Sequence, residues 1–300
     1  MFFLRGDHEK SLENQLFRQA SNAGLETIFS SKIKIKDKKI SLNNNEINSK
    51  IIVGADGVDS IITKHCFPNE KIRMIEGYGQ SYNDLNLPIG ETHIFFEPNH
   101  IPGGYAYTGR TSTLGTIVLG GKNKPSEECF DKIKKSNLKI NKIVGNREGI
   151  QIRGKGIISN INKRVYNNII LVGDAARVAD PLFLYGVRPA LISGDFAVKA
   201  IIEHLERGES LDQYDVLLKN KLLQDHYFLK VARNTLEKIN QKDMEFIIEN
   251  LNHINENIGI DGISERPINS IKTITLLFVK NPYKTTKIGY KVIKSLFEAT

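Results

Sequence analysis

The segment 168–201, NIILVGDAARVADPLFLYGVRPALISGDFAVKAI, constrains the fold of this chain more than any other part of the sequence. Its apolar beginning predicts a buried strand that ends at Gly173-Asp174. Small residues after Gly186 predict a helix, and Pro189 suits its first turn, where the missing N–H of proline costs little. Ligands collect at the carboxyl ends of strands in open α/β sheets. The segment therefore predicts a ligand site at the end of a strand.

A second turn of this kind lies in the segment 51–60, IIVGADGVDS. Glycine allows the backbone to turn sharply and to approach a ligand closely. The carboxylate of Asp56 can accept hydrogen bonds from ligand hydroxyls. Taken alone, a strand followed by Gly-Asp-Gly is also compatible with a plain structural turn.

The order of predicted elements divides the chain into regions of different character. A helix is expected at 8–24 and a strand-like, turn-rich region at about 71–155, with helical periodicity near 127–138 inside it. Amphipathic helical segments are expected at 211–224 and 226–251. This order predicts a nucleotide-binding type of α/β domain that is interrupted by an antiparallel sheet.

The net charge of +8 raises the question of nucleic-acid binding. Much of the excess is lysine, and Lys32 and Lys34 alternate with Ile33 and Ile35 as on a strand with one solvated face. No recognition-helix or aromatic-basic RNA signature is found. Lys-rich surfaces without a nucleic-acid partner are therefore expected. The scattered histidines predict no metal site.

The cysteine content and the hydropathy indicate a cytoplasmic location. Cys66 and Cys129 cannot form a framework of disulfides, which favours a reducing compartment. No apolar run approaches the roughly 20 residues that cross a bilayer. Four lysines recur near the C-terminus at near-helical spacing: Lys284, Lys287, Lys291 and Lys294. This pattern fits peripheral contact with an anionic membrane surface, and it fits slightly better an ordinary amphipathic helix whose lysines are solvated.

The two turns together resemble the paired signatures of the flavin-dependent hydroxylase and reductase superfamily. GADGVDS resembles the first signature, and VGDAARVADP with GVRPALISGDFA resembles the second. Within the superfamily the chain is most similar to the geranylgeranyl reductase family. The stretch MFFLRGDHEKSLENQLFRQASNAGLE at 1–26 resembles the segment of that family in which an arginine and an acidic residue precede a helix. The stretch FEPNHIPGGYAYTGR at 96–110 resembles the family's substrate-domain stretch. The resemblance covers about residues 1–205.

The resemblance implies an α/β (α+β) fold. An incomplete FAD-binding Rossmann-like domain would be interrupted by an antiparallel β-sheet substrate domain and followed by a helical C-terminus. The implied regions are a partial FAD-binding domain without its first βαβ unit at 1–70, a β-rich substrate domain at 71–165, the return of the FAD-binding domain at 166–205 and a helical region at 206–300.

The resemblance also implies FAD as the cofactor and roles for particular residues. Asp174 would contact the ribityl or pyrophosphate portion, and the helix that begins near Gly186 would direct its positive end at the flavin ring. The catalytic proton donor stays unassigned. The residues implied to bind the cofactor are Arg5, Asp56, Gly173, Asp174, Ala175, Pro181, Gly186 and Val187. Those implied to line an apolar substrate tunnel are Tyr105 and Tyr107.

The implied activity is reduction of isoprenoid double bonds of the geranylgeranyl type, with an isoprenoid lipid as substrate and a reduced electron donor. The sequence departs from the family in several respects, which include Tyr107 where the family has tryptophan. The phosphate-binding G-x-G-x-x-G is absent, Arg177 stands where glycine is usual, and Tyr185 stands where a small residue precedes Gly186. We therefore expect an N-terminally truncated relative, and whether it holds FAD without the missing unit stays open. Two alternatives stay open, namely a non-catalytic binding or structural module and a flavin-dependent aromatic hydroxylase.

Overall fold

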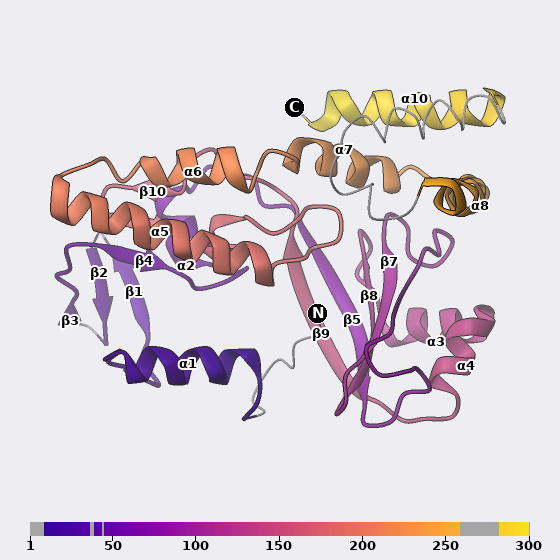
Figure 1. Ribbon diagram of the computed structural model, residues 1–300, viewed down its shortest axis with the longest axis horizontal. Coiled ribbons are helices and arrows are strands. Elements are labelled where there is room, and N and C mark those ends of the chain that lie inside the picture. Colours follow the sequence, from indigo (N-terminus) through magenta and orange to yellow (C-terminus); the bar gives the residue numbers. More distant parts are fainter. Residues whose placement is uncertain (1–8, 37–38, 44, 259–281, 300) are drawn as a thin grey trace.

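The computed structural model describes residues 9–36, 39–43, 45–258 and 282–299, and its fold is mixed α/β with a helical C-terminus (Figure 1). This confirms the fold class expected from the sequence. The boundaries proposed for the four regions stay a prediction.

One part of the structure, the α/β part, combines elements from residues 12–66 with elements from residues 165–221 and contains two small sheets. One sheet is antiparallel, in the order β1-β2-β3, and the other has the order β10-β11-β4, with β11 parallel to β4. The strands are β1 (Ile33–Lys36), β2 (Lys39–Leu42), β3 (Asn45–Glu46), β4 (Ile52–Gly54), β10 (Val165–Tyr166) and β11 (Ile169–Leu171). The helices are α1 (Leu12–Asn22), α2 (Ile61–Cys66), the 3-10 turn η1 (Gly173–Ala176), α5 (Val187–Arg207) and α6 (Gln213–Lys221).

The second region is an antiparallel sheet of five strands in the order β6-β7-β8-β5-β9. Two helices, α3 (Glu127–Ser136) and α4 (Leu138–Val144), lie beside it in Figure 1. The strands are β5 (Met74–Tyr82), β6 (Thr92–Phe95), β7 (Tyr105–Arg110), β8 (Gly115–Gly121) and β9 (Ile150–Ile157). Alternate residues of β8 are buried, as expected for a sheet with one face on a core. Phe130, Ile133 and Ile140 from the two helices complete that core.

Three further helices lie towards the C-terminus: α7 (His226–Leu236), α8 (Gln241–Ile258) and α10 (Pro282–Ala299). The sequence predicted one helical segment at 226–251, and this is wrong. The chain breaks before Asn240, whose side chain accepts a hydrogen bond from the Asp243 N–H at 3.0 Å. The Asn240 N–H in turn donates to the Asp243 carboxylate at 3.4 Å. This reciprocal pairing is a capping box, which starts a new helix at α8.

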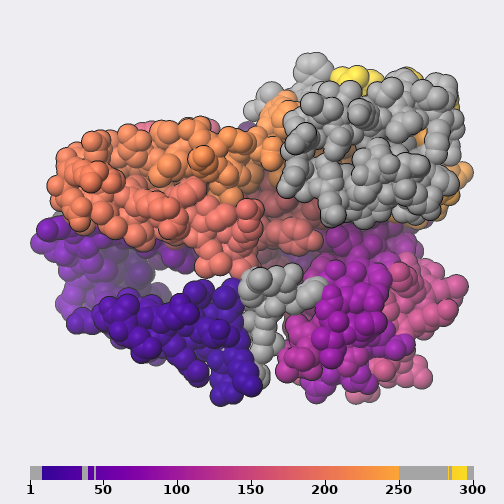
Figure 2. Space-filling view, viewed as in Figure 1, coloured from indigo at the N-terminus to yellow at the C-terminus, as the bar shows by residue number. Residues whose placement is uncertain are grey.

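Two features of the α/β part leave apolar groups open to solvent. Helix α1 forms where the sequence predicted it, but it contains no buried residue, and Leu16 and Phe17 are 40% and 41% exposed. Strand β4 is the last strand of its sheet within the described residues, and Val53 on it is 46% exposed. Figure 2 shows a hollow between the indigo α1 and the salmon α5.

Candidate functional site

The two turns predicted to bind a ligand lie at the same edge of one sheet. Because β4 and β11 are parallel, with Gly54 paired with Leu171, their carboxyl ends meet. The Thr63 hydroxyl of α2 donates to the Ala175 carbonyl of η1 at 2.8 Å and joins the two turns. A narrow crevice of about 10 Å³ lies between them, lined by Val58, Ser60, Thr63, Lys64, Ile72, Ile157, Asp174, Ala175 and Arg177.

Asp56 lies beside this crevice, and its carboxylate caps helix α2. One oxygen accepts hydrogen bonds from the backbone N–H groups of Ile61 at 2.8 Å and Ile62 at 3.2 Å. The other accepts from the Ser60 hydroxyl at 2.6 Å. A carboxylate at the positive end of a helix is stabilised there. The contacts of Asp56 therefore account for its position through local structure, and its role towards a cofactor stays a prediction.

Replacing Asp56 by alanine is expected to lower the free energy of unfolding by about 1 kcal/mol, the usual cost of losing a helix cap. The neighbouring exposed Asp59 pairs with Lys155 at 2.9 Å and provides the matched control. Asp59→Ala should change stability much less, because exposed ion pairs contribute little. Urea denaturation of both variants measures the difference. Equal stabilities would contradict a capping role.

The second turn is held by a buried serine of α5. Gly173 has a φ of +59°, a left-handed conformation that favours glycine. Its N–H donates to the Ser193 hydroxyl at 2.9 Å, and that hydroxyl donates to the Ala190 carbonyl at 2.8 Å. Ser193 is completely buried. Sequence reasoning missed it, because a serine among the small residues of a helix gives no distinguishing signal.

Asp174 lies next to the N-terminus of α5. A Cβ atom added to Gly186 would lie 3.2 Å from the Asp174 Oδ1 atom, so a larger residue at 186 would crowd that carboxylate. Gly186 immediately precedes α5, and Pro189 is buried in its first turn. The site thus combines a half-buried carboxylate with the positive end of a helix of 21 residues. A polyhydroxyl chain can donate to the carboxylate while an electron-rich ring faces the helix end.

Arg177 does not disturb this turn, although the family has glycine there. It adopts the left-handed conformation itself, with φ 53° and ψ 45°. Its guanidinium is engaged elsewhere, since Nη1 donates to the carbonyls of Lys71 and Asn160, both at 3.1 Å. Burial lowers the pKa of the Arg177 guanidinium. The side chain thus ties the turn to the two connections between the α/β region and the β-sheet.

The tyrosines predicted to line a substrate tunnel lie against the loop that leads into α5. The ring of Tyr105 packs edge-on against Phe183 at 5.6 Å between centroids, and the Tyr105 hydroxyl donates to the Phe183 carbonyl. Phe183 in turn stacks on Tyr185 at 5.7 Å. Burial raises the pKa of both Tyr105 and Tyr107, with the nearby Tyr185 adding to the effect. These hydroxyls therefore stay protonated at neutral pH.

Tyr185, which stands where the family has a small residue, lies at the surface of the loop before α5. Its side chain is 53% exposed and lies on Phe183. The same loop is held from the other side by Arg233 of α7, which is 1% exposed and donates to the Leu182 carbonyl at 3.3 Å. Sequence reasoning missed Arg233, because nothing in an amphipathic helix indicates which distant loop it contacts. Arg5, also predicted near the flavin, lies outside the described residues.

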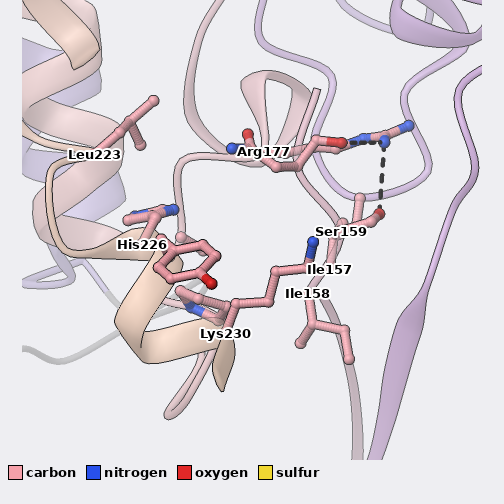
Figure 3. A pocket seen from close by; sticks show the side chains of 11 residues that line it. Ile157, Ile158, Ser159, Arg177, Leu223, His226 and Lys230 are labelled. Carbon is pink, nitrogen blue, oxygen red and sulfur yellow. Dashed lines mark hydrogen bonds between the residues drawn. The ribbon is translucent and has the colours of Figure 1, made fainter. Parts of the chain in front are cut away.

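A larger cavity of about 200 Å³ lies between the end of β9, the Arg177 turn and the first turns of α7 (Figure 3). His226 and Lys230 of α7 line it opposite Ile157 and Ser159. Burial lowers the pKa of the His226 imidazole. Pro181 lines this cavity rather than the crevice between the two turns. Within the described ranges, no group of His, Cys, Asp and Glu could hold a metal ion.

The chain is similar in sequence to proteins named digeranylgeranylglycerophospholipid reductase. It is 26% identical over 271 residues to a digeranylgeranylglycerophospholipid reductase of Methanospirillum hungatei, covering 85% of this chain and 64% of that protein. It is 29% identical over 215 residues to the enzyme of the same name from Methanosphaerula palustris, covering 65% and 53%. The chain thus spans between half and two thirds of the length of these relatives. No protein-family model matches it.

The fold is similar to those of solved flavoprotein structures. A geranylgeranyl bacteriochlorophyll reductase-like protein from Thermoplasma acidophilum superimposes with a TM-score of 0.74 at 17% identity, covering 96% of this chain and 78% of that chain. The flavin-dependent brominase Bmp2 superimposes with a TM-score of 0.58 at 16% identity, covering 80% and 68%. At these identities the structural similarity shows the fold alone. The chain is thus similar in sequence to digeranylgeranylglycerophospholipid reductases and similar in fold to a geranylgeranyl bacteriochlorophyll reductase-like protein.

Proposed function

We propose that this chain forms the part of a flavin-dependent reductase that holds the riboflavin portion of FAD, and that the reductase acts on double bonds of isoprenoid lipids. The observation that carries the proposal is the position of Asp174 between the end of β11 and the N-terminus of α5. The names of the relatives support the substrate class. The individual substrate and the electron donor are not assigned.

The residues of the second turn fit a flavin. Gly173 and Gly186 leave the backbone open on either side of the Asp174 carboxylate, which would accept hydrogen bonds from ribityl hydroxyls. The N-terminus of α5 would face the pyrimidine side of the ring, where reduction adds negative charge. When bound and reduced, the flavin supplies the hydride for the double bond. Tyr105, Phe183 and Tyr185 would exclude water and offer an apolar wall to a prenyl chain.

The ADP portion of the cofactor has no recognisable site in the sequence, which lacks the G-x-G-x-x-G loop. We therefore assign to this chain the riboflavin side of the site only. An aromatic hydroxylase would use the same scaffold, but no contact in the site favours it. A binding module without catalysis would keep the fold but would not require Asp174 or Gly186.

The first test is the visible spectrum of the purified chain after FAD has been added and unbound flavin removed. We expect a retained flavin band and about tenfold weaker binding in Asp174→Ala, the loss expected for one hydrogen bond to a charged group. The control is Asp195→Ala, which removes an exposed carboxylate of α5 that pairs with Lys199 at 2.7 Å. A retained band would justify assays with geranylgeranyl lipids and a chemical reductant. A folded chain that retains no flavin would overturn the proposal that this chain forms the riboflavin site unaided.

A further inference from the structure

Helix α10 has one face on the protein and one face in solvent. On the inner face, Lys291 pairs with Asp243 of α8 and the Ser295 hydroxyl accepts from Lys238 at 2.9 Å. Ser295 is fully buried, and Ile288 and Val292 are half-buried. Figure 1 shows the yellow α10 lying along the outer side of α7. The inner contacts fix which residues of α10 point outwards.

The outer face combines aromatic, apolar and basic side chains. Tyr283, Tyr290 and Ile293 are 80%, 68% and 53% exposed, and Lys287 and Lys294 lie exposed among them. Positions 283, 287, 290 and 294 follow one another at the three- and four-residue spacing of a single helical stripe. The sequence from 282 to 295 contains no Asp or Glu. Of the four lysines noted in the sequence, Lys291 is therefore used inside the protein, while Lys287 and Lys294 remain on the outside.

We propose that this outer face of α10, formed by Tyr283, Lys287, Tyr290, Ile293 and Lys294, binds the surface of an anionic lipid bilayer. Tyrosine has an apolar ring and a polar tip, and it is enriched where membranes meet water. Lysines beside an anionic surface add electrostatic attraction. A helix with this composition lies in the plane of the interface instead of crossing the membrane.

The charge of the face decides between a bilayer and a protein as its partner. Two exposed lysines, Lys287 and Lys294, with no acidic residue in the sequence from 282 to 295, match a negatively charged surface, and the tyrosines beside them match the headgroup level. The same face on an ordinary solvated helix would not require two tyrosines and an isoleucine in solvent. The proposal goes beyond the proposed reductase function and depends on α10 alone, so binding to lipid and retention of flavin can succeed or fail independently.

The test is flotation of the full chain with vesicles of phosphatidylcholine alone and with vesicles that also contain phosphatidylglycerol. We expect binding to the anionic vesicles, reduced by added salt. The double variant Lys287→Gln/Lys294→Gln should bind about 25-fold more weakly, because each lysine contributes about fivefold near an anionic surface. Tyr283→Ser/Tyr290→Ser should weaken binding about tenfold through loss of buried apolar area.

The matched control is Lys219→Gln/Lys221→Gln, which removes two exposed lysines from α6 and should leave binding unchanged. All substituted side chains are exposed, so circular dichroism should show the same helix content in every variant. Equal binding to neutral and anionic vesicles, absence of binding, or an equal loss in the α6 control would overturn the proposal. A change in oligomeric state caused by the tyrosine variant without any vesicle binding would assign the face to a protein contact and would also overturn it.

Discussion

Replacing Asp215 by alanine is expected to lower the free energy of unfolding by about 3–5 kcal/mol, the usual cost of removing one partner from a buried ion pair. Asp215 accepts hydrogen bonds from the Nη1 atom of Arg164 at 3.2 Å and from the Arg164 backbone N–H at 2.9 Å. The Arg164 side chain is 1% exposed, so the substitution leaves a buried guanidinium without its ion-pair partner. Burial already lowers the pKa of the Arg164 guanidinium, with Asp215 opposing the effect.

The neighbouring pair of Lys163 and Asp212 provides the control. Its atoms lie 3.5 Å apart, and its side chains are 62% and 56% exposed. Asp212→Ala should cost less than about 1 kcal/mol, because solvent screens exposed pairs. Guanidinium denaturation of the two variants compares a buried and an exposed aspartate three residues apart. Similar losses in the two variants would contradict the burial of the Arg164–Asp215 pair.

The same ion pair is connected to the proposed flavin turn. The Arg164 Nε atom donates to the carbonyl of Ala176, the last residue of η1, at 2.9 Å. Asp215 on α6 therefore positions Arg164, and Arg164 holds the end of the turn that begins at Gly173. Protection of the η1 amides from hydrogen exchange should fall in Asp215→Ala more than in Asp212→Ala, even before FAD is added.

The paired turns were predictable because each is a local pattern. An apolar strand that stops at glycine and aspartate shows where a strand ends, and parallel pairing then brings two such ends together. The start of α5 after Gly186 was visible for the same reason, since proline and small residues mark a first helical turn. These signals lie within a few residues of the feature that they predict.

The contacts that hold the site were not predictable, because their partners are far apart in sequence. Ser193 supports Gly173, and Arg233 supports the loop before α5, yet both look like ordinary helix residues. Arg177 was interpreted as a departure from the family pattern of the turn. In the structure its guanidinium donates to the carbonyls of Lys71 and Asn160, both more than ten residues away in sequence. Asp56 was interpreted as a ligand residue, and its hydrogen bonds in the structure are those of a helix cap. A residue type alone does not distinguish these roles.

The Pro-Gly-Gly-Tyr stretch shows how a family motif can have a packing cause, and Gly104→Ala tests it. A Cβ atom at Gly104 would lie 2.0 Å from the Gly120 carbonyl oxygen and 2.6 Å from the Ile101 Cγ2 atom. The nearest atom belongs to the backbone of β8, which is paired along its length with β5 and β7 and cannot withdraw. We expect Gly104→Ala to lower the free energy of unfolding by about 3 kcal/mol or more, at the upper end of overpacking costs.

Gly154→Ala in the same sheet is the matched control, since an added Cβ there meets no atom within 4 Å. Alanine at this position should be neutral or stabilise the fold by about 0.4–1 kcal/mol, because it restricts the unfolded chain. Thermal unfolding of the two variants separates a steric effect at one position from a general intolerance of the sheet to alanine. If Gly104→Ala unfolds like the wild type, the close approach of Gly104 to β8 is wrong. If it unfolds early while Gly154→Ala does not, steric closeness to β8 explains the glycine at this position.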